Sequence, residues 1–153
     1  MKKNNEKGFS LVELLVVVII IAIVAAIAIP NLLASRRAAN EASAVNSLRT
    51  IHSAEITYFA TQVSPTYGTL AALNAAGLID SNFTGSAQKS GYDFAASANG
   101  AIAYCANAAP TTPASTGINY FGVGSTNGGV VMKHTAAIAC ASGNLTVVGQ
   151  PVQ

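Results

Sequence analysis

Residues 7–30 read KGFSLVELLVVVIIIAIVAAIAIP, and this stretch decides how the chain of 153 residues is organised. From Phe9 to Ile29 it runs for 21 residues with Glu13 as the only ionisable side chain. A helix of that length is about 31 Å long, close to the roughly 30 Å hydrocarbon thickness of a bilayer. We therefore expect one transmembrane helix over residues 9–29.

Positive charge lies on the N-terminal side of the apolar run. Lys2, Lys3 and Lys7, offset by Glu6, account for the whole formal net charge of +2. The positive-inside rule keeps such a segment in the cytoplasm and sends the chain after Ile29 across the membrane. The basic excess is therefore a topology signal and does not indicate a nucleic-acid partner.

An ordinary secretory signal is the alternative interpretation of the same stretch. It would use the lysines as its n-region, residues 14–25 as its apolar core and Ala26-Ile27-Ala28 as its cleavage site. Composition alone does not separate the two interpretations. Two features favour a helix that is retained: the carboxylate of Glu13 heads the run, and a long helical pattern follows Pro30.

Glu13 needs a physical reason to lie in an apolar run. An acid inside a membrane costs on the order of 2.5 to 3.5 kcal/mol on insertion scales unless it is paired or protonated, so such residues are functional by default. The structural alternative is a carboxylate that reaches up to the lipid headgroups.

The residues K-G-F-S-L-V-E-L-L, followed by Pro30, resemble the type III signal of type IV pilins and pseudopilins. The resemblance covers residues 7–60. It implies that a membrane-embedded prepilin peptidase cuts between Gly8 and Phe9 and methylates the new amino group of Phe9. It also implies that Glu13 pairs with the N-terminal amine of a neighbouring subunit.

Such a pairing makes physical sense as an assembly checkpoint. Two charges that are each expensive in a low-dielectric medium compensate each other when subunits are in register, and both stay uncompensated when they are not.

Pro30 interrupts the helical pattern at the expected membrane edge. Proline removes a backbone donor and clashes with the preceding turn, so a continuous helix is expected to kink or locally melt at this residue. A helix that simply ends at Pro30 is the alternative.

Residues 31–61 contain no Gly or Pro, and apolar residues recur at spacings of three and four. We expect the amphipathic half of one long helix. Four apolar side chains share one sector and are expected to dock on the globular part: Val45, Leu48, Ile56 and Phe59. His52 lies in the same sector and is interpreted as a packing residue rather than a ligand.

Three charged residues follow the membrane exit. Arg36, Arg37 and Glu41 are interpreted as a solvated helix face, with contact between subunits as the alternative. Glu41 lies one turn from Arg37, so the two are expected to form a weak local pair.

The remaining residues, 63–153, predict a small globular domain. Residues 64–68 break the long helix, and Leu70 to Leu78 suggest a short helix capped by Gly77. Strand-like runs follow at residues 92–96, 101–106, 118–123 and 130–134, and Thr126-Asn127-Gly128-Gly129 favours a hairpin turn. The predicted fold class is α+β, a long helix packed on an antiparallel sheet of three to four strands, as in the pilin fold.

The organisation expected along the chain has four parts. They are a leader at residues 1–8, a transmembrane and assembly half of the helix at 9–29, an amphipathic half at 30–62, and the globular part at 63–153.

Cys105 and Cys140 are the only cysteines. An even count in a domain expected to face an oxidising compartment suggests one disulfide, with two free thiols as the alternative.

Motifs for catalysis or cofactors are missing from the sequence. His52 and His134 have no partnering nucleophile in a recognisable motif, and neither a phosphate-binding glycine loop nor a haem-attachment motif occurs. Only Asp80 and Asp93 follow the long helix, so an equivalent of the calcium site of major pseudopilins is doubtful. We expect no enzyme activity, no metal and no cofactor.

The resemblance therefore implies a structural subunit of a homo-oligomeric, helical, type IV pilus-like filament that serves adhesion, twitching motility or DNA uptake. Its expected partners are the prepilin peptidase, an inner-membrane assembly platform and an ATPase. It would be a single-pass inner-membrane protein first and a periplasmic or cell-surface filament later. The alternatives are a pseudopilin of a type II secretion system and a secreted or membrane-anchored binding domain. Residues 43–61, together with residues 77–83 and 89–94, also resemble short bacterial pilins known as secretion-system G-like proteins. This looser resemblance indicates the class of protein more than its role.

Overall fold

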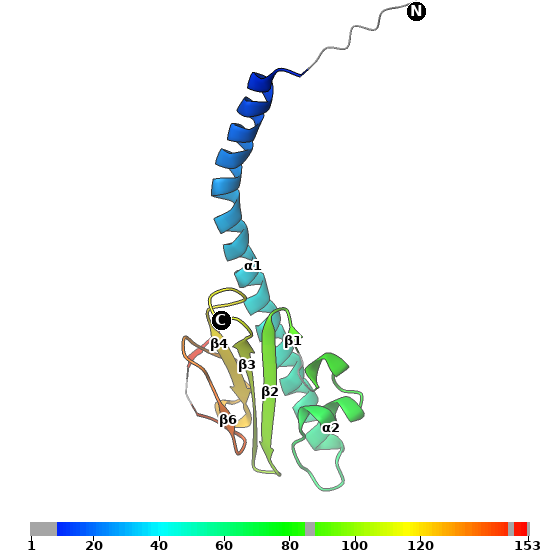
Figure 1. Cartoon of the computed structure of the whole chain (residues 1–153). Coiled ribbons are helices and arrows are strands. Elements are labelled where there is room, and N and C mark those ends of the chain that lie inside the picture. Colours follow the sequence, from blue (N-terminus) through cyan, green and yellow to red (C-terminus); the bar gives the residue numbers. More distant parts are fainter. Residues whose placement is uncertain (1–8, 85–87, 147–148, 153) are drawn as a thin grey trace, which may run out of the picture. The chain divides into compact units, whose positions relative to one another are not determined.

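The computed structural model describes residues 9–84, 88–146 and 149–152. Its internal contacts divide the chain after Ser35 into two compact units, and each is described here by itself. Figure 1 shows the helix of the first unit in blue, and the mixed helix and sheet structure of the second in cyan to red.

The longest element is helix α1, Leu11–Thr61, which spans 51 residues. Pro30 lies inside it, and Figure 1 shows α1 as one unbroken ribbon. The prediction of one long helix is confirmed, and the alternative that the helix ends at Pro30 is wrong. A kink at Pro30 stays a prediction.

The second unit contains a six-stranded antiparallel sheet, with strands in the order β1-β2-β3-β4-β5-β8. Its strands are β1 (Gln88–Lys89), β2 (Tyr92–Asn99), β3 (Ala103–Pro110), β4 (Tyr120–Gly124), β5 (Met132–His134) and β8 (Gln150–Pro151). The α+β fold class is confirmed. The sheet exceeds the three to four strands expected because β1 and β8 are two-residue edge strands, too short to show an alternating pattern.

A two-stranded sheet, β6 (Cys140–Ala141) and β7 (Asn144–Leu145), lies against β3. Both faces of β3 are thereby covered, because Ala106 and Ala108 belong to the core cluster that includes α1 residues, while Cys105 points the other way. A strand buried on both faces shows little alternation, and the first four residues of β3 are all buried. This explains why the sequence pattern placed its start two residues early and its end at Ala106.

The core of the second unit is built between α1 and the sheet. Its α1 members are Ala44, Val45, Leu48, Ile51 and Ala54, and the sheet contributes Tyr92, Phe94, Ala106, Ala108, Phe121 and Val123. The docking prediction was right for Val45 and Leu48 and wrong for Ile56, which is 48% exposed. The buried face is centred on Ala44, Leu48 and Ile51 instead, and Glu55 lies on it with the Gly68 N–H as its hydrogen-bond partner.

Short elements connect α1 to the sheet. Helix α2, Leu70–Ala75, is capped by the Thr69 hydroxyl, which accepts the Ala72 N–H at 3.3 Å, and Gly77 follows it with φ +71°. A 3-10 turn, η1 (Ser81–Phe83), comes next. The expected glycine-capped helix is confirmed.

The turn between β4 and β5 contains η2, Ser125–Asn127, followed by Gly128 and Gly129 at φ +65° and +74°. The two strands pair as an antiparallel hairpin with Tyr120 opposite His134. The expected hairpin is confirmed, and its positive φ angles explain the two glycines.

Candidate functional site

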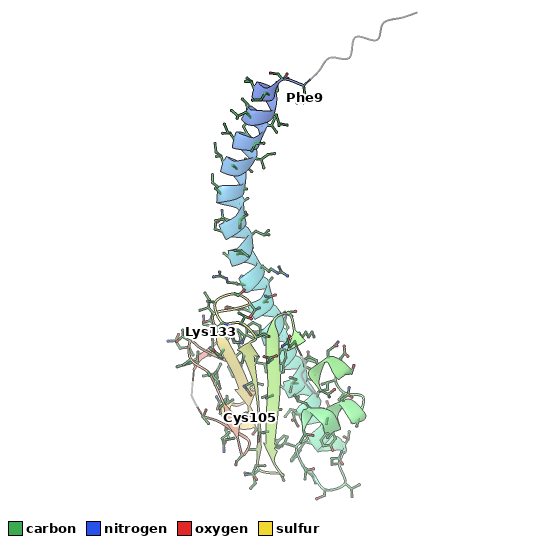
Figure 2. All side chains as sticks on the ribbon, in the orientation of Figure 1. Phe9, Cys105 and Lys133 are labelled. Atoms are coloured by element: carbon green, nitrogen blue, oxygen red, sulfur yellow. A yellow bond between two sulfur atoms is a disulfide. The ribbon has the colours of Figure 1, made fainter. Side chains whose placement is uncertain are left out.

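Phe9, Ser10 and Glu13 form the start of α1. Figure 2 labels Phe9 at the entrance to the helix, and its side chain is 82% exposed. Glu13 Oε2 accepts the backbone N–H of Ser10 at 3.0 Å, and Ser10 O accepts the N–H of Leu14 at 3.2 Å. Ser10 and Glu13 have the S-x-x-E spacing of a capping box, in which the acid satisfies a donor that the helix leaves unpaired.

In the single subunit, Glu13 therefore caps the N-terminus of α1. A carboxylate near a helix N-terminus is stabilised by the backbone donors and by the helix dipole. The cost of holding an acid in an apolar segment is thereby reduced before any partner is present. The capping contact was not foreseen from the sequence, although Ser10 three positions before Glu13 is its signature.

The side chains that follow Glu13 are apolar and exposed around the whole circumference of the helix. Leu14, Leu15, Val18, Ile19 and Ile23 are all at least half exposed. A helix that is hydrophobic all round must be covered, by lipid or by other helices. By length and composition, α1 can cross a membrane.

Pro30 and the polar residues after it lie within the continuous helix. The Asn31 side-chain amide donates to Ile27 O at 3.1 Å, and the Ser35 hydroxyl donates to Asn31 O at 3.0 Å. Such bonds to the preceding turn are typical of polar side chains in apolar helices and support backbone carbonyls next to a proline. Gly8, the predicted cleavage residue, lies outside the described residues.

A cluster around Glu41 ties α1 to the loop at residues 111–119. Glu41 Oε1 accepts the N–H groups of Ile118 and Asn119 at 2.9 and 3.2 Å, and Oε2 accepts Asn119 Nδ2 at 2.8 Å. The Asn40 side-chain amide donates to Thr116 O at 2.9 Å. We call these residues, Asn40, Glu41, Thr116, Ile118 and Asn119, the α1–loop clamp.

The clamp corrects the interpretation of Glu41 as part of a solvated face. Both of its oxygens bind the loop, and within the described ranges no ion pair forms between Glu41 and Arg37. The partners of Glu41 are 77 and 78 positions away, so no local pattern predicts them.

The loop is also held from the sheet side. Tyr92 Oη donates to Asn119 O at 2.8 Å, and a Cβ at Gly117 would lie 2.0 Å from Tyr92 Oη. Gly117 is therefore needed for the loop to pass the tyrosine. Burial raises the pKa of Tyr92, with the nearby charges of Glu41 and Tyr120 as smaller contributions, so this hydroxyl stays a donor.

Glu55 is a fully buried carboxyl on the core face of α1. Oε2 accepts the N–H of Gly68 at 2.9 Å, whereas Oε1 has no hydrogen-bond partner in the described structure. Burial raises the pKa of Glu55 to about 7, and the Gly68 N–H lowers it by a smaller amount. Near neutral pH the carboxyl is thus held partly protonated, where its cost in an apolar setting is lowest.

His52 is half-buried, and its Nδ1 is hydrogen-bonded to the Tyr104 hydroxyl. The two rings stack with centroids 6.0 Å apart. This agrees with the interpretation of His52 as a packing residue. Among the residues that the structure describes, no group of three or more His, Cys, Asp or Glu side chains is arranged to hold a metal ion.

Cys105 on β3 and Cys140 on β6 are joined by a disulfide, with Cα atoms 5.8 Å apart and a sequence separation of 35. Cys105, labelled in Figure 2, is fully buried. The bond fastens the β6–β7 sheet onto the face of β3 that points away from α1.

Comparison with known proteins adds to this geometry. Residues 3–29 match a family model described as the prokaryotic N-terminal methylation motif. The chain is 60% identical over 38 residues to the type IV wide pilus major component PilA4 of Thermus thermophilus, an alignment that covers 25% of this chain and 29% of the relative. The chain thus matches less than a third of that relative's length. Both matches cover a quarter of the chain or less, and they show a similarity to the methylation motif and to a type IV pilus component in those parts.

Proposed function

We propose that this chain, with the N-terminal segment of the type IV pilin family, is a structural subunit of a type IV pilus-like filament built from the inner membrane. The observation that carries the proposal is the first part of α1, which is apolar around its whole circumference and has a single acid in its first turn. Lipid covers such a surface before assembly, and neighbouring helices cover it in a filament core.

The match to the methylation motif over residues 3–29 supports the maturation steps of this proposal. In the proposal, a prepilin peptidase cuts between Gly8 and Phe9 and methylates the Phe9 amine. Cleavage leaves Phe9 as the first residue and Glu13 as the fifth. The new amine and the acid then lie at the same end of the apolar helix.

Assembly then pairs Glu13 with the amine of a neighbouring subunit. The capping contact with Ser10 keeps the carboxylate at the helix start until that amine arrives. An inner-membrane platform and an ATPase supply the work of moving the helix out of the bilayer. The chain itself carries out no catalysis and needs no cofactor in this proposal.

Membrane topology completes the proposal. The N-terminal residues face the cytoplasm, the second unit is periplasmic before assembly, and the filament then serves adhesion, twitching motility or DNA uptake. A disulfide between Cys105 and Cys140 is compatible with an oxidising compartment.

A pseudopilin of a type II secretion system would share the N-terminal motif. The pilus is favoured because the 60% identical relative is a pilus component. Electron microscopy of cells with and without the gene tests the choice. Surface filaments that bind an antibody against this chain and vanish on deletion support the pilus. Unchanged filaments together with loss of exoprotein secretion contradict it.

A further inference from the structure

A pocket lined by polar residues lies where β5 pairs with the edge strand β8 of the six-stranded sheet. Its lining residues are Asn119, Lys133, His134, Thr135 and Gln150. We call it the β5 pocket. Strand β5 provides Lys133 and His134, and β8 brings Gln150 opposite Lys133. Lys133 is labelled in Figure 2.

A glycine makes the approach of β8 possible. A Cβ at Gly149 would lie 2.3 Å from the carbonyl oxygen of Lys133, so any other residue would push the strand away. The wall of the pocket that carries Gln150 therefore depends on this position.

The pocket has one fixed positive charge, the exposed Lys133 ammonium, and polar side chains around it. Asn119 Nδ2 already donates to Glu41, so the free atom of that amide is its oxygen, and the donors come from the other lining residues. Within the described residues, no acceptor engages the Lys133 ammonium, and no lining residue carries a carboxylate. His134 Nδ1 lies 2.9 Å from the N–H of Ala136 and 3.3 Å from its carbonyl oxygen. In the tautomer in which Nδ1 accepts that N–H, which is the shorter contact, Nε2 carries the hydrogen and is a donor. The Thr135 hydroxyl and the Gln150 amide add further donors.

Glu41 is the acid placed next to this pocket, because its carboxylate binds Asn119. Its two oxygens already accept three N–H groups from Ile118 and Asn119. The negative charge is therefore held by the α1–loop clamp, while the positive charge of Lys133 remains unpaired by any described residue.

We propose that the β5 pocket binds a phosphate group. A compact ammonium surrounded by neutral donors is suited to an oxyanion, which accepts several charge-assisted hydrogen bonds at once. For a chain anchored in a bilayer the phosphate comes from the headgroup of an anionic lipid or from free phosphate. This inference is independent of filament assembly.

The test uses the full chain, labelled with ¹⁵N, in a neutral maltoside detergent at pH 7. Inorganic phosphate is titrated against sodium chloride at matched ionic strength, and amide shifts are followed by NMR. We expect saturable shifts at Lys133, His134, Thr135 and Gln150 with phosphate alone. Lys133→Gln should weaken the apparent affinity about tenfold, the loss expected for one charge-assisted hydrogen bond.

Lys89→Gln is the matched control, because it removes the same charge from β1, at the other edge of the sheet. Lys89 Nζ lies 4.8 Å from the Phe83 ring centroid, outside the β5 pocket. This variant should bind phosphate as the native chain does. Lys133→Arg keeps the charge and should retain binding.

Nanodiscs separate the two sources of phosphate. Shifts at the same residues in phosphatidylglycerol discs but not in phosphatidylcholine discs support a lipid headgroup, and saturable shifts with inorganic phosphate support a soluble source. The proposal is overturned if neither phosphate form shifts these amides. Equal responses to chloride, or equal weakening by Lys133→Gln and Lys89→Gln, overturn it too.

Discussion

Glu13 combines two roles that can be separated by substitution. Glu13→Ala removes both the acceptor for the Ser10 N–H and the charge, whereas Glu13→Gln keeps an acceptor oxygen and removes only the charge. We expect both variants to insert and be processed but to yield far fewer filaments, because the neighbour's amine is left uncompensated. Sheared filaments are quantified by immunoblot against the membrane fraction. Normal filament yield from Glu13→Gln would show that capping, and not pairing, is the role of this residue.

Glu55 gives the second unit a pH-dependent stability with a definite sign. Folding raises the pKa of Glu55 from 4.5 to about 7, so the folded state holds the proton more tightly than the unfolded state. The stabilisation is full below pH 4.5 and is lost as pH rises through about 7. Over this pH range the free energy of unfolding falls by on the order of 3 kcal/mol.

Glu55→Gln mimics the protonated carboxyl at every pH. We expect the variant to unfold at a higher temperature than the native chain at pH 8, and the two to be equal at pH 4.5. Near-UV circular dichroism, which follows the packed tyrosines, measures both melts. A native melting temperature that is constant from pH 4.5 to 8 would contradict the burial of an ionisable Glu55.

At the scale of elements, the α1–loop clamp fixes residues 111–119 through one side chain. Glu41→Ala leaves the N–H groups of Ile118 and Asn119 without their acceptor, at a cost of roughly 1.5 to 3 kcal/mol for hydrogen bonds to a charged group. We expect hydrogen exchange to speed up at these two amides and to stay unchanged in β2. Glu41→Gln, which retains one acceptor oxygen, should show a smaller effect. Uniform acceleration across the sheet would mean that Glu41 supports the whole fold rather than the loop.

The disulfide joins two elements that hydrogen bonding in the main sheet does not connect. Closing a loop of 35 positions contributes about 3 to 4 kcal/mol in the chain-entropy model. The double variant Cys105→Ala, Cys140→Ala should lose stability by that amount in urea unfolding, with an unchanged far-UV spectrum. A loss below about 1 kcal/mol would show that packing alone holds β6 on β3.

Features that depend on residues close together in the chain could be predicted from the sequence, and features that depend on distant residues could not. The apolar run, the hairpin glycines and the cap at Gly77 are local patterns, and each predicted an element that the structure contains. Ile56 was misplaced because the buried face is centred on Ala44, Leu48 and Ile51 and includes a carboxylate, Glu55, whose partner Gly68 is reached only in the folded chain. The partners of Glu41 and the β5 pocket likewise come from segments far apart in the chain, so no periodicity reveals them.

At the scale of the whole molecule, the chain combines two units whose surfaces differ in polarity. The first, up to Ser35, has exposed apolar side chains, while the second has its own core between α1 and the sheet. In the proposed function, the first unit exchanges lipid neighbours for neighbouring helices. Such assembly requires that the apolar half of α1 is kept in the mature protein.

Intact-mass and N-terminal peptide mass spectrometry of the mature protein measures this requirement directly. The account predicts a chain that begins at Phe9, with one methyl group on its amine, and that retains Glu13 and the apolar residues up to Ile29. A mature chain that begins at Ile29, after Ala26-Ile27-Ala28, would contradict it, because the helix needed for a filament core would have been removed.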